Sequence, residues 1–95
     1  MQINIIGHGF DVTPTLKEFA EKKLQRLAHH CETIISIDLH FAVEKLQQTV
    51  KGTVYVKGQH LHADASSEDL YSAIDNLVDL LDRQLKRYRE KFSNH

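Results

Sequence analysis

The sequence predicts an α+β fold in the order β-α-β-β-β-α, with a four-stranded mixed sheet and two helices packed on one face of it. Two segments carry apolar residues at helical spacing, and four shorter segments alternate apolar and polar residues as half-buried strands do. Each element has a single apolar side, so both helices must cover the same sheet face. The predicted strands are 2–6, 33–44, 50–57 and 60–65, and the predicted helices are 14–31 and 69–92.

The first strand and the first helix are separated by a turn. Gly7 follows the apolar residues of strand 2–6 and loosens the backbone. Pro14 fits the first turn of a helix, where its missing N–H is not needed, and Thr13 or Thr15 can cap the free amides. The apolar arc of this helix consists of Leu16, Phe19, Ala20, Leu24, Leu27, Ala28 and Cys31.

The helix between the first two strands favours a parallel pairing with a right-handed crossover, and the last three strands are expected to form an antiparallel meander. Polar residues at Lys45–Gln48 and the pair Gly58-Gln59 predict its two turns. The small residues Ala63 and Ala65 on the inward side of the last strand indicate that a helix passes close over it. In the second strand the predicted buried side is Ile35, Ile37, Leu39, Phe41 and Val43.

The last helix combines an apolar stripe with a charge gradient along its axis. Ser66 or Ser67 is predicted to cap it, with Glu68 and Asp69 in its first turn. Acidic residues lead and five cations follow within nine residues, which is more than the helix dipole requires. The stripe is Leu70, Ile74, Leu77, Val78, Leu81, Leu85, Tyr88 and Phe92.

Length and composition predict one soluble domain covering residues 1–95. The net charge of -1 gives no global attraction to RNA or membranes, so an electrostatic partner must meet a local patch. The N-terminus resembles neither a signal peptide nor a membrane span, and a cytoplasmic location without membrane contact is expected. Cys31 is the sole cysteine, which excludes an internal disulfide, and we expect a buried, unreactive thiol.

No catalytic motif is present. The sequence has no glycine-rich phosphate loop, nucleophile elbow or helical metalloprotease signature, so neither enzyme activity nor a cofactor is expected. His60 and His62 project to one side of a strand and His40 lies on a neighbouring strand, an arrangement that can capture a metal ion adventitiously. The alternative, which we favour, is a solvated sheet face without a physiological metal. A metal-dependent enzyme built on these histidines is the weakest interpretation.

Basic residues on both helices give the strongest functional signal. The planar fork of arginine suits phosphate, and its face stacks on bases. Two helices packed side by side are expected to bring their basic flanks together into an RNA-binding patch. The alternatives are a solvated helix end and a protein-interaction module that uses the open sheet face. The candidate RNA-binding residues are Lys22, Lys23, Arg26, Arg83, Lys86, Arg87, Arg89 and Lys91.

Four runs carry a resemblance to a known family: MQINI at 1–5, GQHLHADA at 58–65, DLYSAID at 69–75 and RQL at 83–85. In these runs the chain closely resembles the bacterial ribosome hibernation promoting factors, also called ribosome-associated inhibitor or sigma-54 modulation proteins. The resemblance implies the fold given above. It also implies a factor that binds the small ribosomal subunit and its RNA in the mRNA and tRNA channel. Such a factor inhibits translation in stationary phase and, with a ribosome modulation factor, promotes inactive ribosome dimers.

The chain stops at His95, so we expect the short form of this family, monomeric when free. The alternative is the translation-inhibiting paralogue that stabilises single ribosomes against dimerisation. The family often has Asp-Lys-Leu where this chain has Asp79-Leu80-Leu81, so one phosphate contact is expected to be missing at Leu80. The resemblance carries the RNA-facing cations over to Lys23, Arg26, Arg83, Arg87, Arg89 and Lys91, with Lys22 and Lys86 as additions.

Overall fold

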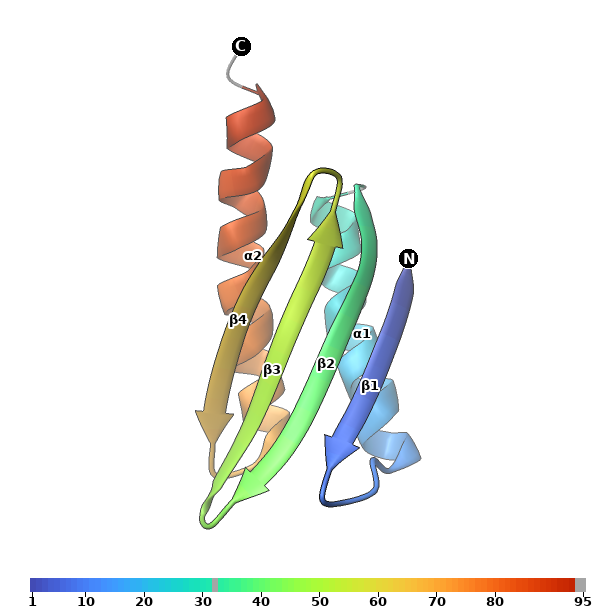
Figure 1. Ribbon diagram of the computed structural model, residues 1–95, viewed down its shortest axis with the longest axis vertical. Coiled ribbons are helices and arrows are strands. Elements are labelled where there is room, and N and C mark those ends of the chain that lie inside the picture. Colours follow the sequence, from blue (N-terminus) through green and yellow to red (C-terminus); the bar gives the residue numbers. More distant parts are fainter. Residues whose placement is uncertain (32, 94–95) are drawn as a thin grey trace.

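A computed structural model describes residues 1–31 and 33–93 and confirms the predicted order of elements (Figure 1). None of the helices in these ranges is long and apolar enough to cross a membrane. The elements are β1 (Gln2–His8), α1 (Pro14–His30), β2 (Ile34–Glu44), β3 (Gln47–Val56), β4 (Gln59–Ser67) and α2 (Leu70–Ser93).

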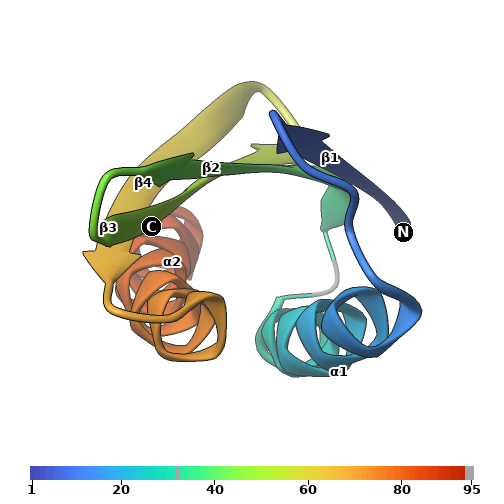
Figure 2. The ribbon, with the colours of Figure 1, turned by 90° about the horizontal axis from the view of Figure 1, so that it is seen from below.

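The four strands form one sheet in the order β1-β2-β3-β4. β1 pairs with β2 in parallel, placing Ile5 beside Leu39, and the later pairs are antiparallel. Figure 2 shows both helices lying side by side beneath the same face of the sheet, as predicted. The opposite face is left open, because each strand presents its polar residues there.

The core lies between this sheet and the two helices. α2 packs closely on β3 at Gly52, where an added Cβ atom would stand 2.9 Å from Cδ2 of Leu77. The predicted helical stripes are buried, apart from a partly exposed Phe19 and Ala28, and the side chain of Phe92 lies outside the part of the chain that the structure describes. The largest fully buried side chains are Phe41, Leu24, Leu27, Ile37, Leu39, Ile74, Leu77, Leu81, Leu85, Val50 and Val54.

A bulge at the start of β2 changes which residues of this strand are buried, so the predicted core was wrong there. Ile34 pairs with Val56 and Ser36 pairs with Tyr55, so one extra residue is inserted between them. Ile34 is therefore buried, whereas Ile35, the predicted core residue, is 61% exposed. The prediction for Val43 was also wrong, because half of its surface is exposed.

The ends of the helices confirm one predicted cap and correct another. Thr13 caps α1, its hydroxyl accepting a hydrogen bond from the amide of Leu16. Neither Ser66 nor Ser67 caps α2, because both belong to β4. Asp69 caps α2 instead, and its carboxylate accepts hydrogen bonds from the backbone N–H and the hydroxyl of Ser72. The hydrogen bond from the backbone N–H is the main cause of the lowered pKa of Asp69.

The first hairpin turn is shorter than predicted, and the second has the predicted length but lies one residue earlier. The first consists of residues 45–46, with Lys45 at a positive φ of 54°, and Gln47 already belongs to β3. The second consists of residues 57–58, with Gly58 at a φ of 86°, and Gln59 begins β4. Glycine adopts this left-handed region without a steric penalty.

Candidate nucleic-acid interface

The two helices run in the same direction along the sheet and contact each other along one seam (Figure 1, Figure 2). The rings of Phe19 and Tyr71 meet edge to face at 5.0 Å. Further along, Lys23 Nζ lies 3.1 Å from Asp75. At the end of α1, His30 Nδ1 lies 2.9 Å from Asp82. The partners in every contact are 52 positions apart, so the helices keep one register along the seam.

α2 is longer than α1, with 24 residues against 17. Since α1 ends level with Asp82, residues 83–93 extend about 16 Å beyond the end of α1. The hydroxyl of Tyr88 donates a hydrogen bond to the carbonyl of Lys57, which ties this segment to the turn between β3 and β4. The last turns of α2 then project past the sheet (Figure 1). We call residues 83–93 the α2 overhang.

All five predicted cations of α2 lie on this overhang and are exposed to solvent. Arg87 and Lys91 line a shallow groove of about 310 Å³ together with Gln59 and Leu61 of β4. The overhang therefore presents a dense positive charge that no other helix covers, a geometry that suits contact with phosphates. Its cations are Arg83, Lys86, Arg87, Arg89 and Lys91.

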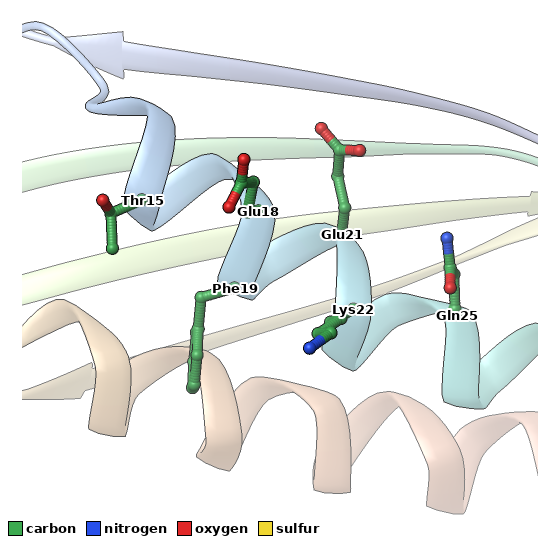
Figure 3. Close-up of a pocket in the computed structure, with 6 residues that line it drawn as sticks. All are labelled: Thr15, Glu18, Phe19, Glu21, Lys22 and Gln25. Carbon is green, nitrogen blue, oxygen red and sulfur yellow. The ribbon is translucent and has the colours of Figure 1, made fainter.

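The cations of α1 form a second group. Lys22 and Arg26 are exposed, whereas Lys23 is half-buried, paired with Asp75 and placed 5.4 Å from the ring centre of Phe19. Figure 3 shows Lys22 on the outer surface of α1 in a hollow that also contains Glu18 and Glu21. These carboxylates weaken the positive potential around Lys22.

The two groups do not merge into one continuous patch. The register of the seam puts Arg26 level with Val78, which is about 14 Å along the axis from Arg87. Asp82 lies on the seam between the groups, and Asp75 is paired with Lys23 beside the α1 group. The predicted residues therefore form a strong cluster on the α2 overhang and a weaker one on α1.

Asp82 links the two helices electrostatically. Burial works against its ionisation, but the hydrogen bond and charge of His30 and the nearby Lys86 ammonium outweigh burial. The pKa of Asp82 consequently lies below its ordinary value. Lys86 Nζ lies 3.6 Å from this carboxylate, so its charge is partly engaged within the protein.

Cys31 and Leu80 are two further positions that the sequence analysis singled out. Cys31 is buried, as expected, and its sulfur lies 3.1 Å from the hydroxyl of Thr33. Leu80 is 37% exposed on the flank that it shares with Gln84 and Arg87, one and two turns further along α2. An apolar side chain thus stands at the edge of the basic cluster, at the position where the sequence analysis expected a phosphate contact to be missing.

The histidines predicted as an adventitious metal site are not grouped together. His62 is hydrogen-bonded to Thr53, and His60 lies beside the ring of Tyr55. His40 instead meets His8, a residue that the sequence prediction omitted because it ended the first strand at Ile6. Within residues 1–31 and 33–93, no group of three or more metal-ligating side chains could hold an ion.

The chain is similar to known proteins of one family. The family profile described as "Sigma 54 modulation protein / S30EA ribosomal protein" matches residues 3–93. This chain belongs to that family. The ribosome hibernation promoting factor of Azotobacter vinelandii is 46% identical over 91 residues, covering 96% of this chain and 85% of that protein. The factor of the same name from Escherichia coli K12 is 37% identical over the full length of both chains.

Two solved structures share the fold. A ribosomal subunit interface protein from Coxiella burnetii superposes with a TM-score of 0.90 at 36% identity, covering 95% of this chain and 99% of that one. The N-terminal domain of Protein Y from Thermus thermophilus superposes with a TM-score of 0.86 at 28% identity, over 93% and 99%. The S30EA family is not an enzyme family, which confirms the expectation that this protein is not an enzyme.

Proposed function

We propose that this protein is a ribosome hibernation factor that binds the small ribosomal subunit. The names of its relatives support a role in ribosome hibernation. The observation in this chain that supports it best is the α2 overhang, where five exposed cations extend beyond α1. A protein with a net charge of -1 needs such a local concentration of charge to bind RNA.

The mechanism we propose is occupancy rather than chemistry. The α2 overhang contacts phosphates of ribosomal RNA, and Lys22 and Arg26 add a second, weaker contact from α1. Bound in the channel used by mRNA and tRNA, the domain excludes both ligands. Release of the protein restores the channel, so inhibition is reversible.

The protein acts in the cytoplasm in stationary phase, as part of the response to stress. It is a monomer when free and promotes inactive ribosome dimers together with a ribosome modulation factor. The alternative role within the same family is stabilisation of single ribosomes against dimerisation.

Sucrose-gradient sedimentation of ribosomes with added protein tests this function. We expect the protein to migrate with small subunits and intact ribosomes, but not with isolated large subunits, and to be displaced by excess tRNA. A protein-interaction module that uses the open sheet face would stay at the top of the gradient, and that result would refute the proposal. Gradients with and without the modulation factor separate the two roles, because only a dimer-promoting factor increases the dimer peak.

A further inference from the structure

Two histidine rings meet on the sheet face that the helices leave open. In the parallel register, His40 lies opposite Ile6 and Ala42 lies opposite His8, so both imidazoles project to the same side. His8 Nε2 lies 2.9 Å from His40 Nδ1. The ring centres are 5.1 Å apart and the ring planes differ by 14°. Because the gap between the two nitrogens accounts for most of this separation, the rings meet edge to edge with those nitrogens facing each other.

We propose that His8 and His40 form a binding site for a divalent transition-metal ion such as Zn²⁺. A neutral imidazole offers one ring nitrogen with a free lone pair, which is why histidine is a common metal ligand. In the metal-free protein the facing nitrogens share one proton in a hydrogen bond. On metal binding, the ring that donates this hydrogen bond moves its proton, through solvent, to its other ring nitrogen, which leaves a lone pair on the facing nitrogen. The ion then takes the place of the proton and is held by both lone pairs.

Only small movements are needed for this exchange. Zinc binds nitrogen at about 2.0–2.1 Å, so two nitrogens on a tetrahedral ion stand about 3.3 Å apart. The facing nitrogens must therefore separate by about 0.4 Å, and the rings must turn until their lone pairs converge. His8 is exposed and His40 is partly exposed, so neither ring is held in place by the core.

The surroundings leave room for the ion. The pair borders a shallow hollow of about 460 Å³, in which the small side chain of Ala42 lies next to His8. Glu44 lines the same hollow and adds negative charge at its rim. Lys51, the cross-strand partner of His40, opposes cation binding, and His62 lies on the far side, bonded to Thr53. Two water molecules complete a four-coordinate ion, one more than in catalytic zinc sites, which have three protein ligands and one water.

Titration calorimetry of the untagged protein with zinc chloride at neutral pH tests the site. We expect saturable binding of one ion per chain. His8→Gln and His40→Gln should each weaken binding by at least about tenfold, because loss of even an outer-shell partner commonly has that effect. His60→Gln is the matched control, since it removes an imidazole from the same sheet face beside Tyr55 and should leave the affinity unchanged.

A second readout identifies the ligating atoms. Zinc should shift the ¹⁵N resonances of His8 Nε2 and His40 Nδ1 in the natural protein and leave those of His60 in place. Circular dichroism checks that each variant is folded, as expected for open-face substitutions. Absence of saturable heat, equal affinity in all three variants, or unshifted His8 and His40 resonances at saturating zinc would overturn the proposal.

Discussion

Gly52 allows α2 to lie close to β3, and Gly52→Ala should destabilise the protein. The new methyl group would stand 2.9 Å from Cδ2 of Leu77 and 3.2 Å from Cδ2 of Leu39, both fully buried. Overpacking of this kind costs about 1–3 kcal/mol. Replacing glycine offsets about 0.4–1 kcal/mol of this by reducing the entropy of the unfolded chain. We therefore expect the free energy of unfolding to fall by about 1–2 kcal/mol.

Urea denaturation of a double-mutant cycle measures this effect. Leu77→Val removes the Cδ2 atom that the new methyl group would meet, at a cost of about 0.5–1.5 kcal/mol on its own. The double variant should be less destabilised than the sum of the two single variants by at least about 0.5 kcal/mol. If Gly52→Ala is neutral or stabilising, or if the two effects simply add, the close packing of α2 on β3 is not what requires glycine here.

Two further predictions concern helix ends and pH. Thr13→Ala should lower the free energy of unfolding by about 1 kcal/mol in thermal denaturation, because it removes the cap of α1. The neighbouring Thr15→Ala removes no cap and should change stability little. Equal losses in the two variants would contradict the assignment of the cap. The lowered pKa of Asp82 stabilises the folded state above the ordinary aspartate pKa of about 3.9, and this contribution is lost as pH falls through the folded pKa. Urea denaturation from pH 6 to about pH 3 should therefore show a smaller loss of stability in Asp82→Asn than in the natural protein.

The sequence was sufficient for the order of elements and for most of the core, because helical and alternating periods are local patterns. It failed at Ile35, since a single inserted residue exchanges the two faces of a strand and leaves no signature in composition. It also misplaced the cap of α2, because Ser66, Ser67 and Asp69 are all competent caps, and only the length of β4 decides among them.

The sequence names the candidate cations, which stay a prediction, but the single patch expected from them was wrong. Nothing in the sequence fixes the register between two helices that are far apart in the chain. The pairing of Lys23 with Asp75 and the separation of Arg26 from the α2 overhang follow from that register. The meeting of His8 with His40 likewise depends on the register of parallel strands and on a first strand longer than its apolar residues indicate.

We propose that exposed cations of the α2 overhang bind ribosomal RNA. The direct test is the affinity for small ribosomal subunits, measured between about 50 and 200 mM salt. Arg83→Glu with Arg87→Glu should weaken binding and reduce the slope of log affinity against log salt by about 1.4–1.8, which corresponds to two phosphate contacts. Lys45→Glu with Lys51→Glu makes the same change in net charge at two exposed lysines of the β2–β3 hairpin, away from the overhang, and should behave as the natural protein does. Equal affinity and slope in all three proteins would contradict the account.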